Sequence, residues 1–213
     1  MTALPESVAA LRGILPVSRE TERRLTLYVE LLRKWQPAQN LVSPRTMGEI
    51  WTRHIADSAQ LVALFPEDRH WVDIGSGGGL PGLVTGILLA DKPGASIVCV
   101  ESNQKKCAFL RTVARETGAP VTVRDGRIES VLKQLDGPVD RMSARALAPL
   151  DKLLDLASPL MARGVPAAFH KGEDFDEELA EASQSWSLDL VRHKSLIDPA
   201  SSIVEIRRAE RRL

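Results

Sequence analysis

A glycine-rich segment carries the clearest chemical signal in this sequence. It runs from Asp73 to Gly82 and reads Asp-Ile-Gly-Ser-Gly-Gly-Gly-Leu-Pro-Gly, directly after a short apolar run. Glycine has no Cβ, so such a segment can adopt positive φ angles and can let a ligand approach main-chain N–H groups. The segment therefore predicts a loop that binds a flat or anionic ligand.

The spacing of these glycines fits two cofactors. Gly77, Gly79 and Gly82 satisfy the G-x-G-x-x-G fingerprint of dinucleotide binding, which is weak by itself. Asp73 places a carboxylate where it would repel a pyrophosphate but could accept hydrogen bonds from the ammonium group of a methionine moiety. Pro81 removes one N–H donor from the helical turn that a pyrophosphate would use. Both residues favour S-adenosylmethionine over NAD.

A second candidate, Glu101, ends the next apolar run along the chain. Ligands of doubly wound sheets bind beyond the carboxyl ends of the strands, so a carboxylate at this position can hold a ribose diol. Either nucleoside cofactor would use it. The alternative interpretation is an ordinary acidic residue at the start of a helix.

Short apolar runs alternate with helical stretches from residue 70 onward. This alternation is typical of an α/β protein with a doubly wound, mostly parallel sheet covered by helices on both faces. The expected strands are 71–74, 96–101, 121–124, 140–144 and 165–169, and the expected helices are 81–90, 103–117, 126–134 and 149–162. Two further runs, 187–194 and 201–207, predict an antiparallel hairpin at one sheet edge. The acidic run 173–181 before them predicts a solvated helix start.

The first part of the chain has helical periodicity only. Ser18 is the expected N-cap of a helix whose apolar stripe ends at Pro37, and a second helix is expected after Pro44. We therefore divide the chain into a helical extension, 1–69, packed on the core, and a cofactor-binding domain, 70–213.

The composition limits the partners and the location. The 28 Lys and Arg balance the 28 Asp and Glu among 213 residues, so the chain lacks the overall positive field that would announce a nucleic-acid partner. Cys99 and Cys107 are expected to be reduced, buried thiols. Because no run approaches the ~20 apolar residues that span a bilayer, we expect a cytoplasmic protein that binds no membrane. We expect no metal site.

Several short motifs occur in a fixed order from about residue 25 to the C-terminus. They are Lys34-Trp35, Asn40-Leu41-Val42-Ser43, Arg53-His54-Ile55 with Asp57-Ser58, the glycine loop, Ser143-Ala144-Arg145-Ala146 and Lys171-Gly172. Together they resemble the 16S ribosomal RNA guanine-N7 methyltransferases, also called the glucose-inhibited division protein B family. The resemblance implies a seven-stranded class I methyltransferase (Rossmann-like) domain preceded by helices. It also implies S-adenosylmethionine as cofactor, 16S ribosomal RNA within the small subunit as partner, and a monomer.

The resemblance also implies site residues. In this sequence its cofactor contacts fall on Gly75, Leu80, Ile128, Glu129 and Arg145, in addition to Asp73, Gly77, Gly79 and Glu101. Arg145 follows the fourth predicted strand and could hold a cofactor carboxylate or an RNA phosphate. The candidates for contact with the substrate RNA, which we call the RNA-side candidates, are Asn40, Arg53, His54 and Lys171.

Three further expectations concern charged and polar neighbours. Arg53 could pair with Asp57 one helical turn away. RNA affinity requires a local basic patch, which we hypothesise from Arg53, Arg127, Arg145, Lys171 and the arginine tail 207–212. His170 stands where the family often has an apolar residue, so the resemblance gives it no role.

The implied reaction needs no dedicated general base. Guanine N7 has a free lone pair at neutral pH, so catalysis comes mostly from alignment. Cytosine C5 enzymes need a cysteine nucleophile in a loop, whereas Cys99 lies in a predicted strand and Cys107 in a predicted helix. Enzymes that methylate exocyclic amines typically have an Asn/Asp-Pro-Pro-aromatic element, whereas this chain has Ser143-Ala144-Arg145-Ala146.

Three alternatives stay open at this stage. The same loop and fold would suit a methyltransferase that acts on a small molecule or a protein. An NAD-dependent oxidoreductase and a non-catalytic nucleotide sensor are the other two.

Overall fold

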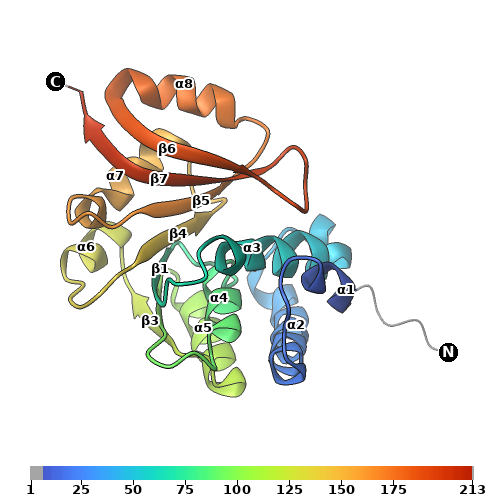
Figure 1. The fold of residues 1–213 in the computed structure, drawn as a ribbon. Coiled ribbons are helices and arrows are strands. Elements are labelled where there is room, and N and C mark those ends of the chain that lie inside the picture. Colours follow the sequence, from blue (N-terminus) through green and yellow to red (C-terminus); the bar gives the residue numbers. More distant parts are fainter. Residues whose placement is uncertain (1–6, 213) are drawn as a thin grey trace.

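The centre of the molecule is a seven-stranded sheet (Figure 1), seen in a computed structural model that describes residues 7–212. The strands are β1 (His70–Ile74), β2 (Ser96–Glu101), β3 (Val121–Asp125), β4 (Arg141–Arg145), β5 (Ala167–Lys171), β6 (Trp186–Lys194) and β7 (Ser202–Arg211). Their order is β3-β2-β1-β4-β5-β7-β6, with β1 to β5 parallel and β7 antiparallel to β5 and β6. The predicted α/β class, the mostly parallel sheet and the edge hairpin are confirmed.

One strand lies two residues later than predicted. β5 runs from Ala167 to Lys171, whereas the prediction was 165–169. Pro166 has no N–H to donate to the ladder, and only its carbonyl takes part, accepting from the backbone N of Met142 at 2.9 Å. Regular pairing therefore begins at Ala167, and Lys171 is the last residue of the strand, whereas the prediction placed it two residues beyond the strand end.

Helices cover both faces of the sheet (Figure 1). They are α4 (Gly82–Leu88), α5 (Gln104–Thr117), α6 (Ile128–Lys133), α7 (Leu150–Met161) and α8 (Phe175–Ser185). One apolar cluster includes Leu83 of α4 and Phe109 of α5. The other includes Leu132, Leu154 and Phe175 of α6, α7 and α8. The two clusters are the two layers of core expected of a doubly wound sheet.

The described segments before the sheet are helical. They are α1 (Ser7–Arg12), α2 (Arg19–Gln39), a 3₁₀ helix η1 (Pro44–Glu49), a π-helix η2 (Ile50–Ala56) and α3 (Asp57–Leu64). The predicted N-cap is confirmed, because the hydroxyl of Ser18 accepts from the backbone N of Thr21 at 3.0 Å. The single helix expected after Pro44 is replaced by three successive segments of different winding.

The expected end of α2 at Pro37 is wrong. The helix continues to Gln39 and ends at Asn40, which adopts a left-handed conformation with φ 47°. Proline removes one helical hydrogen bond, but the following turn is held by other contacts. The side chain of Gln36 accepts from the backbone N of Leu41 and donates to the carbonyl of Val42. These contacts compensate locally for the lost N–H.

A buried tyrosine joins the helical extension to the glycine loop. Tyr28 of α2 is fully buried and packs beside Phe109 of α5. Its hydroxyl donates to the carbonyl of Gly78 at 2.6 Å. The extension thus contributes to the same apolar cluster as α4 and α5 and also fixes the position of the loop.

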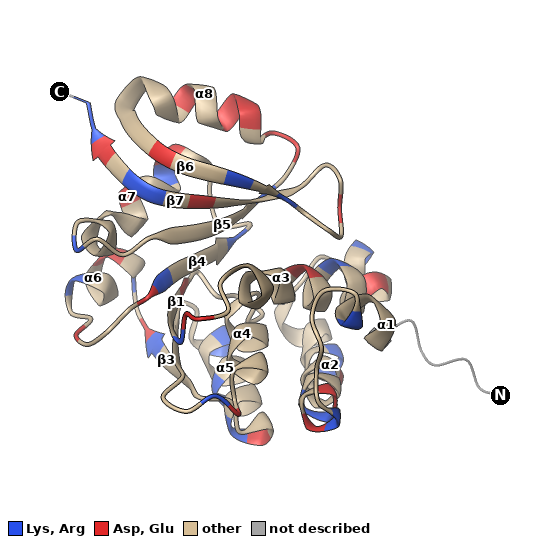
Figure 2. Ribbon diagram, viewed as in Figure 1, with Lys and Arg blue, Asp and Glu red and all other residues tan. Residues whose placement is uncertain are grey.

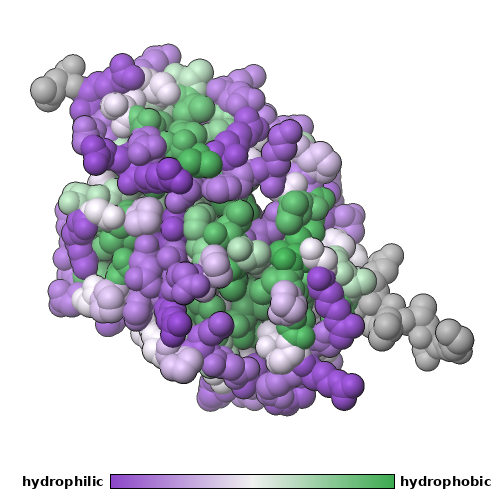
Figure 3. All heavy atoms as spheres, viewed as in Figure 1, coloured by the Kyte–Doolittle hydropathy of each residue, from purple (hydrophilic) through white to green (hydrophobic). Residues whose placement is uncertain are grey.

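Within residues 7–212, no helix is long and apolar enough to cross a membrane. On the face seen in Figure 3, hydrophobic residues appear in patches separated by hydrophilic ones.

Replacing Tyr28 with Phe tests the connection between the extension and the loop. The substitution leaves a buried carbonyl without its donor, so we expect a loss of about 1–3 kcal/mol in the free energy of unfolding. In a chain of this size that corresponds to a fall of roughly 2–4 °C in Tm per kcal/mol. Thermal and denaturant unfolding measure it.

The matched control is Thr26→Ala, because the hydroxyl of Thr26 is exposed on the same helix and bonds only to the carbonyl of Glu22. Its Tm should stay close to that of the parent protein. Equal stability of the two variants would contradict the structural role of the Tyr28 hydroxyl.

Candidate active site

The glycine loop lies where the strand order of the sheet reverses. β1 has β2 on one side and β4 on the other, and ligands of such sheets bind beyond the carboxyl ends of the strands at this point. Gly75, Gly77 and Gly79 have φ angles of 68°, 53° and 88°. The positive φ angles expected from the sequence are therefore present.

A cavity of about 880 Å³ opens above this loop. We call it the first cavity. Its walls come from 40–43, 75–78 with Leu80, 100–102, 126–129 and 145–148, with Thr46, His54, Lys106, Lys152 and Leu156. It brings together seven of the nine residues predicted to contact the cofactor: Gly75, Gly77, Leu80, Glu101, Ile128, Glu129 and Arg145. The RNA-side candidates Asn40 and His54 also line it.

The other two predicted cofactor residues do not line this cavity. Asp73 lies inside β1 and is 1% exposed, and its carboxylate accepts from the backbone N of Gly82 at 3.2 Å and from the hydroxyl of Ser143 at 2.8 Å. The carboxylate therefore joins the loop to α4 and β4 instead of facing a ligand ammonium group. Gly79 lies against Leu83 of α4, so closely that a Cβ would be 2.2 Å from its Cδ1.

Glu101 closes the other side of the loop. It is the last residue of β2, and its carboxylate accepts from the backbone N of Gly77 at 2.9 Å and from that of Asn103 at 2.8 Å. Asn103 itself is the N-cap of α5. The acidic group therefore lies beside the loop, at the strand end where a ribose diol would bind.

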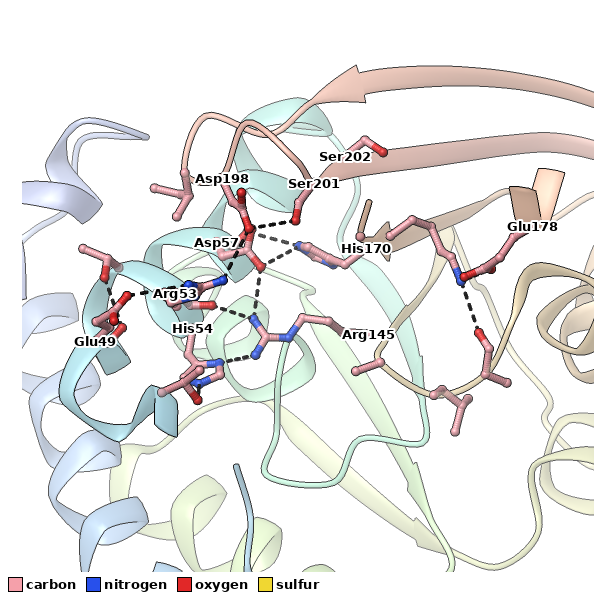
Figure 4. A pocket seen from close by; sticks show the side chains of 18 of the residues that line it. Glu49, Arg53, His54, Asp57, Arg145, His170, Glu178, Asp198, Ser201 and Ser202 are labelled. Atoms are coloured by element: carbon pink, nitrogen blue, oxygen red, sulfur yellow. Dashed lines mark hydrogen bonds and ion pairs between the residues drawn. The ribbon is translucent and has the colours of Figure 1, made fainter. Parts of the chain in front are cut away.

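A second cavity, of about 710 Å³, is shown in Figure 4, and it adjoins the first. The two share Thr46, His54 and the segment 145–148. The other walls of the second cavity come from η1, η2, the end of β5 and the loop between β6 and β7. Arg53 and Lys171, predicted on the RNA side, line this second cavity, whereas Asn40 lines only the first.

Arg145 stands between the two cavities. Its guanidinium donates to the carboxylate of Asp57 at 3.1 Å and to the carbonyl of Arg53 at 3.0 Å, and it contacts Nδ1 of His54. Because a guanidinium can only donate, Nδ1 of His54 accepts and its Nε2 donates to Thr46 at 2.8 Å. Burial and the neighbouring Arg145 lower the pKa of His54 to about 3, so this imidazole is neutral.

The predicted pair between Arg53 and Asp57 is wrong. Asp57 turns toward the sheet, where Arg145 holds its carboxylate at 3.1 Å. Arg53 instead lies 3.4 Å from the carboxylate of Asp198 and 3.8 Å from that of Glu49. The predicted pair does not form because Asp57 takes its partner from β4, while Arg53 lies near Asp198 in the loop after β6 and near Glu49 one helical turn before it.

Lys171 has a partner that the sequence did not indicate. Its ammonium pairs with the carboxylate of Glu178 on α8 and donates to the carbonyl of Ala148 at 3.2 Å. Glu178 belongs to the acidic run that was interpreted as a solvated helix start. α8 does begin in that run, but this one carboxylate lies in the cavity wall, and only the packing of α8 reveals it.

The arginine tail does not belong to a basic patch at the cavities. β7 is antiparallel to β5, so Ser202 pairs with Lys171 whereas Arg211 lies at the opposite end of the sheet (Figures 1 and 2). Arg211 pairs there with Asp155 at 2.5 Å and stacks over Trp186. That part of the patch hypothesis is wrong, because the strand direction carries the tail away from the site.

The sheet order, the glycine loop after β1 and the acidic residue at the end of β2 define the class I S-adenosylmethionine-dependent methyltransferases. Solved structures of this class share the fold at low identity. One is the S-adenosylhomocysteine-bound methyltransferase PaMTH1 of Podospora anserina, with a TM-score of 0.60 and 17% identity, over 92% of this chain and 99% of that chain. Another is the O-methyltransferase TomG of Streptomyces achromogenes, with a TM-score of 0.60 and 11% identity, over 95% of each chain.

The family is shown by sequence. The family model described as rRNA small subunit methyltransferase G matches residues 21–203. The protein named ribosomal RNA small subunit methyltransferase G from Bradyrhizobium sp. (strain ORS 278) is 47% identical, over 98% of this chain and 94% of its own length. The protein of that name from Brucella anthropi is 47% identical over 96% of both. The chain belongs to the rRNA small subunit methyltransferase G family.

The buried carboxylate of Asp73 predicts a pH dependence of stability. Burial raises its pKa from 3.8 to about 6. A carboxyl group with a raised native pKa stabilises the native state fully below about pH 4, and this contribution is lost as the pH rises through about 6. In Asp73→Asn, the amide oxygen can accept from Gly82 and the amide nitrogen can donate to Ser143, so the fold should persist.

We expect the stability of Asp73→Asn relative to the parent protein to increase by about 3 kcal/mol between low and neutral pH, the equivalent of a shift of about two pKa units. Denaturant unfolding of both proteins over this pH range measures the difference. A difference independent of pH would show that the carboxyl group does not titrate as stated.

Proposed function

We propose that this protein transfers the methyl group of S-adenosylmethionine to N7 of one guanine in 16S ribosomal RNA, within the small ribosomal subunit, as a cytoplasmic monomer. The observation that carries the proposal is the pair of adjoining cavities that share Arg145. One lies at the position of the sheet where cofactors bind, and the other lies beside it, where an acceptor base must enter. The names of the relatives supply the substrate RNA.

The residues of the first cavity fit the cofactor. At Gly77 the place of a Cβ is open, with only the carbonyl of Gly75 within 4 Å, which leaves room against the backbone. The cavity volume of about 880 Å³ is in the range of small-molecule sites, ~300–1,000 Å³. When bound, S-adenosylmethionine supplies an electrophilic methyl group on a sulfonium centre.

Each proposed contact has a chemical reason. Glu101 accepts from the ribose hydroxyls, and the loop residues Gly75, Gly77 and Leu80, which line the cavity, pack against the ligand. Ile128 offers an apolar surface to adenine, and its neighbour Glu129 accepts from a polar edge. Asp73 and Gly79 support the loop from behind.

The walls of the second cavity provide orientation rather than a base. Asp57 is paired with Arg145, Glu178 with Lys171, and Asp198 with Arg53 (Figure 4). His54 is neutral and already bonded at both ring nitrogens. Guanine N7 needs no proton removed, so this environment suits alignment of a neutral nucleophile. The carboxylates of Asp57 and Glu178 lie where they can stabilise the cationic product base.

Cations at the rim of the first cavity provide phosphate contacts. Lys106, Arg127 and Lys152 line it, and none of them forms an ion pair with a carboxylate in the described chain. Cations without a carboxylate partner are the ones able to bind RNA phosphates. They replace the arginine tail in the proposed basic surface.

A methyltransferase acting on a small molecule or a protein is the second candidate, because the fold permits it equally. Membership of an rRNA methyltransferase family does not support the oxidoreductase or sensor alternatives.

Transfer of labelled methyl groups to small ribosomal subunits tests the proposed function. With subunits from a strain that lacks the modification, we expect label at N7 of a single guanine of 16S RNA, located by chemical cleavage and primer extension. Fully modified subunits are the control and should accept none. Absence of label on subunits and on naked RNA would refute the proposal and favour the small-molecule candidate.

Glu101→Gln tests the cofactor assignment. The variant keeps the size of the side chain but loses the charged acceptor, so the affinity for S-adenosylhomocysteine should fall roughly tenfold to a hundredfold. Calorimetric titration measures the Kd. Glu116→Gln, at an exposed position on α5, is the control and should bind like the parent protein. Equal affinities in both variants would remove Glu101 from the cofactor site.

A further inference from the structure

His170 lines the second cavity, and neither the family resemblance nor the proposed chemistry gives it a role. It lies in β5, one residue before Lys171, and its side chain is 7% exposed. The imidazole forms part of the cavity wall and faces Asp57 at the start of α3 (Figure 4). A polar ring placed at a buried strand end requires an explanation, because an apolar residue would pack there without desolvating polar atoms.

Asp57 fixes the tautomer of this histidine. Nε2 of His170 lies 3.1 Å from the backbone carbonyl of Asp57, which can only accept, so Nε2 carries the proton. Burial lowers the pKa of His170, Arg145 lowers it further, and Asp57 opposes both effects. The ring is therefore neutral near pH 7, and its Nδ1 presents a lone pair.

That lone pair has no partner in the described chain. Nδ1 of His170 is buried without a hydrogen bond, and so is the hydroxyl of Ser202, which lines the same cavity. A buried acceptor without a donor costs free energy, and a bound ligand is one way in which such a group is satisfied. The unpaired nitrogen and hydroxyl of two residues that line one cavity therefore point to a ligand that brings N–H donors.

We propose that His170 recognises the acceptor base, with its Nδ1 accepting a hydrogen bond from an N–H group on the Watson–Crick edge of guanine. This inference rests on the proposed function and deepens it. Guanine carries two donor groups on that edge, N1–H and the 2-amino group. Adenine has an acceptor at N1 and no 2-amino group, and its one donor on that edge is the 6-amino group. In the orientation of guanine it would therefore place the N1 lone pair against the lone pair of His170.

The same contact leaves the reacting atom free. N7 lies on the major-groove edge of guanine, away from N1 and the 2-amino group. A guanine held by His170 at its Watson–Crick edge can therefore present N7 toward the first cavity. Arg145, between the two cavities, then borders the path of transfer.

Three substitutions at this position separate the acceptor from the rest of the ring. His170→Asn keeps an oxygen close to the position of Nδ1. His170→Gln reaches the position of Nε2 but offers no acceptor at Nδ1, and His170→Leu removes both. We expect kcat/KM for unmodified subunits to fall about threefold to tenfold in the Gln and Leu variants, through KM, and to recover in the Asn variant.

Two readouts guard against a structural effect. The Kd for S-adenosylhomocysteine should be unchanged in all three variants, since His170 does not line the first cavity. His70→Leu is the control, because His70 begins the central strand β1, at the end of the parallel strands opposite to the cavities, and pairs with Asp140. It should leave KM for subunits unchanged.

A measurement on the parent protein is independent of folding effects in the variants. In ¹⁵N-histidine-labelled protein saturated with S-adenosylhomocysteine, the Nδ1 resonance of His170 should start as an unprotonated nitrogen. It should shift on addition of guanosine monophosphate and not on addition of adenosine monophosphate.

The outcomes separate the two proposals. If the parent protein methylates subunits but the Gln and Leu variants keep its KM, or if Nδ1 does not respond to guanosine monophosphate, the role of His170 is refuted. If the parent protein transfers no methyl group to subunits, the proposed function itself fails.

Discussion

Arg145 stands at the carboxyl end of β4 with its guanidinium between the sheet and the helices of the extension, where it meets Asp57, His54 and the carbonyl of Arg53. The arrangement of both cavities depends on this contact. The side chains of Arg145 and Asp57 are each 15% exposed, so removing either one leaves a largely shielded charge without its partner. Burial and this contact together lower the pKa of His54 and keep its ring neutral, and the contact also orients Asp57, whose carbonyl accepts from His170. Arg145 thereby influences which atoms in the wall of the second cavity donate and which accept hydrogen bonds.

The glycine loop of the first cavity depends on another carboxylate, the buried side chain of Asp73, which has a different role. Asp73 binds the backbone N of Gly82 and the hydroxyl of Ser143, while Tyr28 holds the carbonyl of Gly78 from the opposite side. The loop is fixed at both ends before any ligand binds, which lowers the entropic cost of binding. The burial that raises the pKa of Asp73 is the consequence of this position behind the loop.

Much of the fold and part of the site could be predicted from local pattern. The five parallel strands, the edge hairpin and the positive φ angles of the loop follow from apolar runs and from glycine spacing, which act over a few residues. The continuation of α2 through Pro37 and the later start of β5 could not be predicted in this way. Helix α2 continues because the side chain of Gln36 holds the following turn, and β5 starts later because Pro166 has no N–H for the ladder, so that pairing with β4 begins at Ala167.

The sequence by itself determined the class of fold, the loop that approaches the cofactor and the acidic residue at the end of β2, because strand periodicity and the absence of a Cβ are properties of the residues themselves. The tertiary structure alone decided the partners of the charged side chains. It turned Asp73 inward, gave Asp57 to Arg145 rather than to Arg53, placed Glu178 beside Lys171 and carried the arginine tail to the far end of the sheet. Ion pairs and hydrogen bonds form between groups that are close in space, and only the packing of distant segments determines which groups those are.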